Sequence, residues 1–181
     1  MFHKKLSGLS QEVELTTMLQ GRKVDQRMGS IVWTHFGISG PVAMDASRFW
    51  TMGQETGESP ALYGNFLPGT MQDQGKQWFM GQAAGSPRRS LAKTLAQRVS
   101  ERFAEALCMY VECEPQKAIA QLHRKDRDRL IEALSRFRFT VEHARGWNYA
   151  EVTAGGVPLE EIDYRTMECK LMPRLYLVGE T

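Results

Sequence analysis

The chain has 181 residues, 42% hydrophobic and 24% charged, which is the composition of a soluble globular protein with enough apolar material for a core. Its 23 Lys and Arg against 21 Asp and Glu leave a net charge of +2, too little to favour a nucleic-acid or anionic-membrane partner. Three cysteines without C-x-x-C spacing favour reduced thiols. The sequence has neither an apolar run of about 18 residues nor the pattern of a signal peptide. We therefore expect a cytoplasmic protein with no membrane and no nucleic-acid partner.

Residues 12–36 are predicted to form a β-hairpin. Val13 and Leu15 begin a partly alternating apolar pattern, residues 21–23 supply the turn region, and residues 28–36 supply the second strand.

A short helix is expected to follow, from Pro41 to about Trp50. Proline suits the first helical position because it has no N–H to leave unpaired, and Ser39 is placed to cap the helix just upstream. The residues expected to face inward are Val42, Ala46 and Phe49.

The start of this helix is a candidate anion site. A helix start preceded by small residues, here Gly37, Ser39 and Gly40, offers N–H groups at the positive end of a dipole. His35 would add a proton donor near neutral pH. The alternative is an ordinary capped helix with a locally satisfied histidine.

Residues 51–85 contain seven glycines and few long apolar runs. Residues 61–67 are predicted to form a strand ended by the turn dipeptide Pro68-Gly69, and residues 78–80 another short buried run. Short strands with glycine-rich turns favour a small barrel or sandwich.

A helical part is predicted to begin at residues 86–87. One apolar stripe at three- and four-residue steps indicates a helix of about six turns, and a second short helix is expected from Pro115 to about Leu122. The stripe consists of Leu91, Leu95, Val99, Phe103, Leu107 and Tyr110. Arg98–Glu101 and Arg102–Glu105 are candidate ion pairs on the opposite face, worth only about 0.2–0.5 kcal/mol each.

A third helix is predicted from a cap at Asp126 to about Arg136, with Leu130, Ile131 and Leu134 inward. Residues 123–129 are strongly basic, but interleaved Asp residues and the lack of an aromatic platform favour a solvated helix start over a nucleic-acid patch. Residues 137–141 alternate between apolar and polar and predict a half-buried strand.

Two short runs near the end of the chain resemble strands, residues 150–153 and 175–178. The second is wholly apolar, which suits a strand buried on both faces of a parallel sheet. Gly155-Gly156 follows the first run and Gly179 the second, at strand ends where ligands bind in α/β sheets. Ordinary turn glycines are the alternative.

Several blocks together resemble a family of bacterial flavoproteins. TAGGV (153–157), TMECK (166–170) and LYLVGE (175–180) are similar to the segment by which NAD(P)/FAD-dependent oxidoreductases of the aminoacetone oxidase family return to their FAD-binding domain. WTHFGISGP (33–41) resembles the insert-domain signature of the same family, and KLSGLS near the start and residues 130–142 extend the resemblance over most of the chain.

This resemblance implies an FAD site in the complete protein. The residues implied on the flavin side are Thr153, Ala154, Gly155, Gly156, Val157, Gly179 and Glu180, where the Glu180 carboxylate would accept hydrogen bonds from ribityl hydroxyls. His35, Gly37, Ser39 and Gly40 would lie near the flavin or the substrate. The implied partners are the rest of the FAD-binding domain, a small-molecule substrate and NAD(P)H as a candidate electron donor.

The fold class we expect is α+β: a β-rich barrel-like insert (1–85), a helical subdomain (86–136), and returning strands of a glutathione-reductase-like FAD domain (137–181). No G-x-G-x-x-G is present, so we expect part of a longer flavoprotein that binds FAD weakly or not at all alone. No metal-binding spacing and no G-x-S-x-G elbow occur. The competing hypotheses are a non-catalytic scaffold or binding module and, more weakly, a basic RNA-binding domain.

Overall fold

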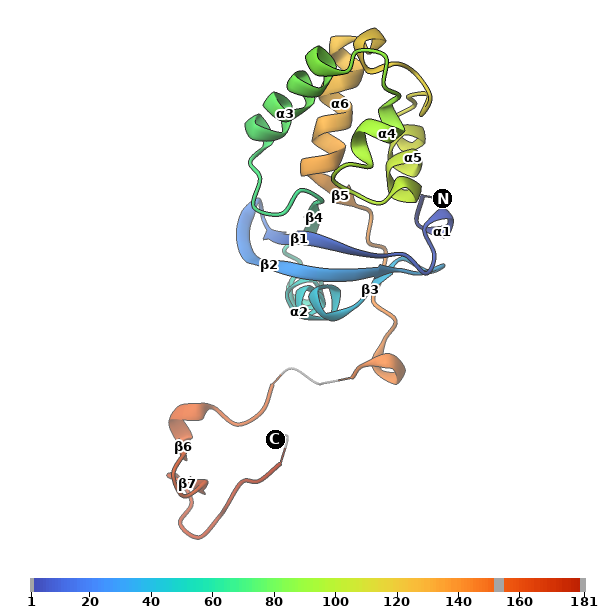
Figure 1. Ribbon diagram of the computed structural model, residues 1–181. Coiled ribbons are helices and arrows are strands. Elements are labelled where there is room, and N and C mark those ends of the chain that lie inside the picture. The colour runs from blue at the N-terminus through green and yellow to red at the C-terminus, as the bar shows by residue number, and fades with distance from the viewer. Residues whose placement is uncertain (1, 152–154, 180–181) are drawn as a thin grey trace. The chain divides into compact units, whose positions relative to one another are not determined.

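The computed structural model of the chain describes residues 2–151 and 155–179, and the chain separates into two compact units, 1–144 and 145–181 (Figure 1). The first unit combines a curled sheet with a group of helices, which confirms the predicted α+β class. The proposed three-part division at residues 85 and 136 stays a prediction. Within the described residues, no helix is long and apolar enough to cross a membrane.

The first unit is built on a five-stranded antiparallel sheet, half of a barrel, in the order β3-β2-β1-β4-β5. Its strands are β1 (Ser10–Leu19), β2 (Arg22–Trp33), β3 (Ile38–Ser39), β4 (Ala61–Asn65) and β5 (Phe137–Phe139). The predicted hairpin is confirmed as β1–β2. Gln20 and Gly21 form its loop with φ of 48° and 77°, the two positive values that a two-residue hairpin turn needs.

The predicted strands at 61–67 and 137–141 are confirmed as β4 and β5. They pair with each other although about 70 residues separate them, with Leu62 opposite Phe139. In sequence, residues 66–136 with their helices are therefore inserted between two strands that are neighbours in the sheet.

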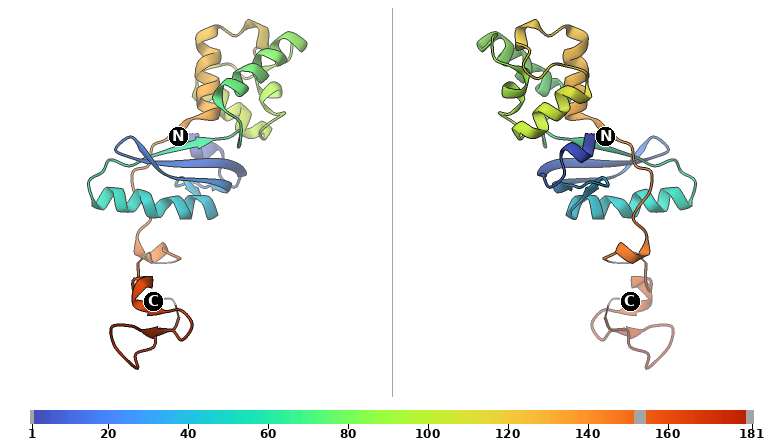
Figure 2. Two further views of the ribbon diagram at one scale, coloured as in Figure 1. Left: turned by 90° about the vertical axis from the view of Figure 1, so that its left-hand side faces the viewer. Right: turned by 90° about the vertical axis from the view of Figure 1, so that its right-hand side faces the viewer.

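The predicted helix after the hairpin is confirmed as α2 (Pro41–Glu55), which packs on β1 and β2 and extends five residues beyond the expected end. It covers one face of the sheet, and the other helices lie on the opposite side (Figures 1 and 2). Two details of the prediction are wrong. Gly40, not Ser39, is the N-cap residue and no side chain caps the helix, while Trp50 rather than Phe49 is buried.

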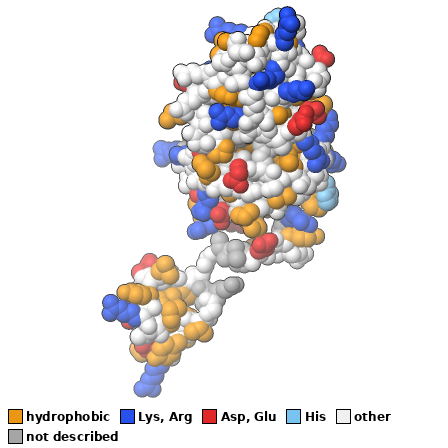
Figure 3. Space-filling view, in the orientation of Figure 1, with side chains coloured by type: hydrophobic (Ala, Val, Ile, Leu, Met, Phe, Trp, Pro, Cys, Tyr) orange, Lys and Arg blue, Asp and Glu red, His pale blue; other side chains and the backbone are white. Residues whose placement is uncertain are grey.

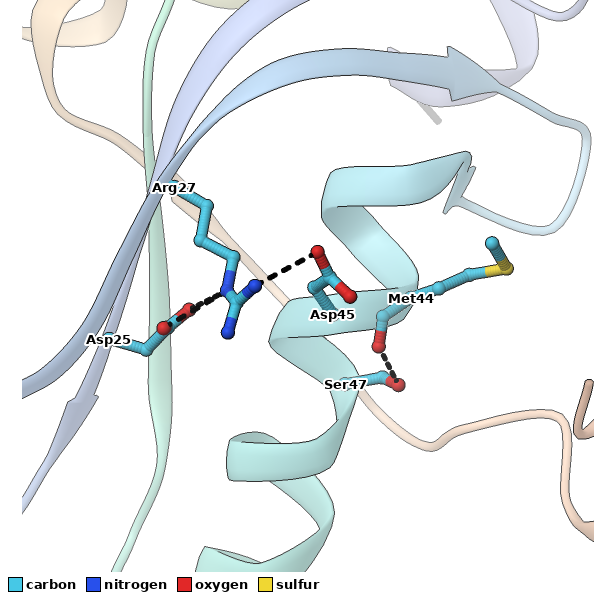
Figure 4. A network of polar contacts seen from close by, with 5 residues as sticks. All are labelled: Asp25, Arg27, Met44, Asp45 and Ser47. Atoms are coloured by element: carbon cyan, nitrogen blue, oxygen red, sulfur yellow. Dashed lines mark hydrogen bonds and ion pairs between the residues drawn. The ribbon is translucent and has the colours of Figure 1, made fainter. Parts of the chain in front are cut away.

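Arg27 on β2 ties α2 to the sheet. Its guanidinium contacts Asp25 on the same strand and Asp45 on α2, each at 3.1 Å (Figure 4). The hydrogen bond that Arg27 donates to Asp25, assisted by the negative charge of both carboxylates, raises the pKa of Arg27. Next to this bridge, the Ser47 hydroxyl donates to the Met44 carbonyl oxygen within α2.

The remaining helices of the first unit form one group. They are α1 (Phe2–Lys5), α3 (Gln72–Gly85), α4 (Leu91–Leu95), α5 (Glu101–Tyr110), the 3₁₀ turn η1 (Ile119–Gln121) and α6 (Arg124–Ser135). The predicted third helix is confirmed as α6, with Leu130, Ile131 and Leu134 buried.

Three helical predictions are wrong. The run at 78–80 belongs to α3, where Phe79 is buried and Met80 exposed as in an amphipathic helix. The single six-turn helix is instead α4 and α5, because Ser90 and Ser100 each cap a new helix start by accepting from the backbone N–H three residues on. The helix expected from Pro115 is reduced to η1.

The candidate ion pairs Arg98–Glu101 and Arg102–Glu105 do not form among the described residues. Arg98 instead stacks over the Trp78 ring at 5.5 Å, and Arg102 Nε donates to the Lys5 carbonyl oxygen at 2.9 Å.

An aromatic core joins the sheet to the helices. Trp33 at the end of β2 lies with its ring centroid 5.4 Å from Phe2, 6.1 Å from Phe66 and 6.0 Å from Phe103, so strand, loop and helix share one packed centre. Phe137 completes the cluster beside Phe66. The first unit therefore has a single continuous hydrophobic core rather than one core for each half.

The second unit has little regular structure. Its elements are the 3₁₀ turns η2 (Trp147–Tyr149) and η3 (Leu159–Glu161) and the short strands β6 (Ile162–Asp163) and β7 (Glu168–Cys169), which form a hairpin. The predicted strand at 175–178 is reduced to one bridge between Tyr176 and Glu168, and most of the run is exposed. Burial on both faces would need parallel neighbours that the described residues do not provide. Ala150 lies in no strand, and residues 152 and 153 fall outside the described part.

Candidate functional site

The loop between β2 and α2 is a tight turn organised by Thr34. The Thr34 hydroxyl oxygen accepts from the N–H groups of Phe36 and Gly37 at 3.3 and 3.1 Å, and the Thr34 N–H donates to the Gly37 carbonyl oxygen at 2.8 Å. This turn places His35 on the surface, where its ring lies 3.6 Å from that of Phe36. The sequence did not single out Thr34, although a threonine before a glycine-containing loop is a known turn former.

Gly40 explains why this turn can lie against the sheet. Its φ is 97°, and a Cβ there would lie 3.0 Å from the Ser30 carbonyl oxygen and 3.3 Å from the Ile31 Cα. Only glycine allows that approach. Ser39 pairs with Val32 as part of β3, and Gly37 has open space around it. The four predicted residues 35, 37, 39 and 40 are therefore brought together on one loop of the first unit.

The predicted flavin-side residues belong to the second unit. Gly155 and Gly156 have φ of 129° and 122°, and Gly179 has φ of 97°, so all three adopt backbone conformations that other residues rarely reach. Val157 is half-buried. Thr153, Ala154 and Glu180 lie outside the described residues.

The described glycines suit the flavin ring of FAD but not its pyrophosphate. A Cβ on Gly155 or Gly179 would meet no atom within 4 Å, so the backbone there is open to the close approach of a planar ring. The pyrophosphate of FAD needs a glycine-rich loop at a helix start, and the sequence has no such loop. Of these two requirements, the described residues meet the first, open backbone at the glycines, and the sequence lacks the second, the phosphate-binding loop.

The second unit is held by backbone hydrogen bonds more than by a core. The Cys169 N–H donates to the Leu175 carbonyl oxygen at 2.8 Å, and the Leu177 N–H donates to that of Met167 at 2.9 Å. Among its described residues only Cys169 is buried. Its exposed large apolar side chains are Trp147, Tyr149, Leu159, Tyr164, Met167, Leu171, Met172, Leu175, Tyr176 and Val178. Exposed apolar surfaces of this kind are typical of segments that bind another protein surface.

The connection from α5 to α6 forms a second feature that the sequence did not reveal. The Cys113 N–H donates to the Cys108 carbonyl oxygen at 2.8 Å and the Glu112 N–H to that of Met109 at 3.1 Å, with Glu112 at φ 60°, which is a Schellman end to α5. Beyond it lies an open depression of about 590 Å³. Its lining residues are Glu112, Cys113, Glu114, Gln116, Lys117, Ala118, Gln121 and Asp126.

The two thiols at this helix end are poor nucleophiles. Burial raises the pKa of Cys108 to about 12 and also raises the pKa of Cys113. No group of three or more His, Cys, Asp or Glu side chains within residues 2–151 and 155–179 is arranged to hold a metal ion.

The first unit thus combines a half-barrel sheet with a group of helices, and a short, mostly exposed segment follows it. The chain belongs to the HI0933-like family: the model described as "HI0933-like protein barrel and H2TH domain" matches residues 1–152.

Three curated relatives are similar over most of the chain. The ribosomal RNA dihydrouridine synthase of Escherichia coli is 33% identical over 152 residues, 83% of this chain and 35% of that protein. The protein of the same name from Haemophilus influenzae is 28% identical over 179 residues, 99% of this chain and 41% of that protein. The 3-dehydro-bile acid delta(4,6)-reductase of Clostridium scindens is 24% identical over 176 residues, 97% of this chain and 43% of that protein. The chain therefore spans less than half the length of each.

Proposed function

We propose that this chain is the barrel-and-helix part of an FAD-dependent oxidoreductase, together with the segment that returns to the FAD-binding domain. The main support for this proposal is the contrast in apolar burial between the two units of the chain. The first unit has a complete core, whereas the second exposes ten large apolar side chains and buries only Cys169 among its described residues. Such a segment needs another surface, and the relatives have more than half of their length outside the matched region.

The names of the relatives support a common reaction type. Taken at their names, a dihydrouridine synthase makes dihydrouridine from uridine and a delta(4,6)-reductase reduces a bile-acid double bond, so both add hydrogen across a carbon–carbon double bond. Bound FAD would supply the hydride for such a reduction, and NAD(P)H is the candidate source of its electrons. We propose the same class of reaction for the parent protein, with an RNA uracil as the leading substrate because the two ribosomal RNA enzymes are the more similar relatives.

In this proposal the chain's own residues bind and shape rather than carry electrons. The open backbone at Gly155 and Gly179 would contact the flavin edge. The Thr34-organised turn holds His35 exposed, where it can hydrogen-bond to a substrate carbonyl. FAD, the roles of these residues and a cytoplasmic location are all part of the proposal.

The visible absorbance of the protein made from the complete gene tests this assignment. A flavin spectrum in the long protein, bleached by NAD(P)H, and little or none in the 181-residue chain mixed with FAD is the expected result. If the long protein is colourless and its upstream sequence lacks G-x-G-x-x-G, the chain is a non-catalytic scaffold or binding module instead.

A further inference from the structure

The charge of the first unit is unevenly divided between the sheet with α2 on one side and the other helices on the opposite side. Helix α1 packs on α5, through the contact of Phe2 with Phe103 at 6.0 Å and the hydrogen bond from Arg102 to Lys5, so it belongs with the helices. We call α1 and residues 72–136 the helical half. It has 14 Lys and Arg against 8 Asp and Glu, a net +6, whereas residues 6–71 and 137–144, the rest of the first unit, have 5 against 7, a net −2. The whole-chain value of +2 conceals this separation.

The carboxylates of the helical half neutralise few of its cations. Every residue of this half is described, and its ion pairs involve only two cations, Arg129 with Asp126 and Glu112, and Arg124 with Asp128. The cations without an ion pair are Lys4, Lys5, Lys76, Arg88, Arg89, Lys93, Arg98, Arg102, Lys117, Lys125, Arg127 and Arg136. The Asp residues that interrupt the basic run at 123–129 are thus satisfied by Arg124 and Arg129, and Lys125 and Arg127 remain unpaired.

Backbone pairing gathers cations from separate parts of the sequence. The Leu91 N–H donates to the Lys117 carbonyl oxygen at 3.0 Å and the Ile119 N–H to that of Arg89 at 2.9 Å, so the segments 87–92 and 115–120 run side by side. On the face drawn in Figure 3, Lys and Arg side chains cover more of the helical half than Asp and Glu side chains do. Arg98 against the partly exposed ring of Trp78 adds an aromatic–guanidinium pair of a kind on which bases stack.

We propose that the helical half is the surface of this protein that binds the phosphate backbone of RNA. This inference rests on the proposed function, because the RNA substrate comes from the names of two relatives, and it assigns that substrate to a surface. Phosphate contacts are electrostatic and position an RNA without reading its sequence. Within the first unit, a net +6 on the helical half beside a net −2 on the rest would orient a polyanion toward the helical half.

A pair of charge-matched variants tests the surface. One combines Arg88→Glu, Lys93→Glu and Lys125→Glu, all exposed and unpaired on the helical half. The other combines Arg22→Glu, Lys23→Glu and Arg48→Glu, all exposed on the sheet side. Both change the net charge equally, so only location differs. Circular dichroism and thermal melting establish that each is folded.

The measurement is fluorescence anisotropy of a labelled RNA stem–loop with the 181-residue chain, from about 50 to about 200 mM KCl. We expect the helical-half variant to bind at least about tenfold more weakly, with a log K against log [salt] slope shallower by about 2–3, because each lost phosphate contact removes nearly one unit. The sheet-side variant should stay within about twofold of the unmodified chain. Equal weakening in both variants, or no binding by the unmodified chain at the lowest salt, overturns the inference.

The flavin spectrum of the long protein separates this inference from the proposed function. A flavin-loaded long protein whose chain binds no RNA refutes the RNA surface and leaves the oxidoreductase assignment. RNA binding through the helical half of a protein without flavin refutes the oxidoreductase assignment and supports the surface. Loss of RNA binding in the helical-half variant of the long protein, with flavin retained, supports both.

Discussion

The two compact units of this chain differ in how far they bury their large apolar side chains. In residues 1–144 strands and helices that are distant in sequence share one core, with Trp33, Phe103 and Leu107 almost completely buried. In residues 145–181 backbone hydrogen bonds define a small hairpin, but the large apolar side chains remain exposed. The first unit has a hydrophobic core of its own, whereas the second leaves most of its large apolar side chains exposed.

The largest expected difference between the units comes from the same substitution in each. Leu107→Ala removes a side chain with 0% exposure, and we expect it to lower the free energy of unfolding by about 2–5 kcal/mol. Leu159→Ala removes one that is 84% exposed, and we expect a change within about 0.5 kcal/mol. Urea unfolding followed by tryptophan fluorescence measures both. Equal losses would mean that the second unit has a core of its own.

Alkaline pH should weaken the first unit through its buried thiols. Because burial raises the pKa of Cys108 from 9.0 to about 12, the folded state keeps a proton that the unfolded state loses. Stability is unaffected below pH 9 and falls as pH rises from 9 towards 12, by at most about 1.4 kcal/mol per unit for this thiol. Cys108→Ala should reduce that slope in urea unfolding across this range. An unchanged slope would show that Cys108 ionises as readily in the fold as outside it.

The close approach of the β2–α2 turn to the sheet can be tested at Gly40. Gly40→Ala should cost about 1–3 kcal/mol, because it combines a strained φ of 97° with a Cβ 3.0 Å from the Ser30 carbonyl oxygen. Gly69→Ala is the control, since Gly69 has φ of 71° but no atom within 4 Å of its Cβ position. Gly69→Ala should lower the free energy of unfolding by less than Gly40→Ala, because only at Gly40 would the new Cβ press against the sheet backbone. Thermal melting that ranks the two equally would contradict the close approach.

The smallest expected effect is the loss of a helix cap, tested by comparing the observed cap at Ser100 with the predicted cap at Ser39. Ser100→Ala removes the hydroxyl that accepts from the Phe103 N–H and should cost about 0.5–2 kcal/mol. Ser39→Ala should cost less than about 0.5 kcal/mol, because Ser39 caps no helix and is exposed on β3. If denaturant unfolding shows a larger loss of stability for Ser39→Ala than for Ser100→Ala, Ser39 caps a helix as the sequence predicted.

The elements that the sequence predicted correctly are those with a strong local pattern. The hairpin alternates, α6 repeats its apolar residues at helical spacing, and β5 alternates again. The break between α4 and α5 was missed because the apolar stripe continues across it, and only the capping hydroxyls of Ser90 and Ser100 mark the new starts. Helix α3 was missed because its three adjacent large side chains resemble a buried strand, while its glycines weaken the helical signal.

The candidate site was predicted less completely than the fold. Residues 35–40 do lie together, because a single turn contains them, but Thr34 organises that turn through hydrogen bonds that residue spacing does not reveal. The apolar run at 175–178 forms one bridge instead of the predicted buried strand, because the described residues provide no neighbouring strands for it. The charge separation could have been found by summing charges by region rather than over the whole chain.

We propose that residues 145–179 form a return segment that the rest of a flavoprotein completes. Hydrogen–deuterium exchange of this segment in the 181-residue chain and in the flavin-loaded long protein tests it most directly. We predict fast exchange around Leu175 and Val178 in the chain alone and strong protection in the long protein, with residues 1–144 nearly unchanged. Equal protection of residues 145–179 in both proteins would contradict the claim.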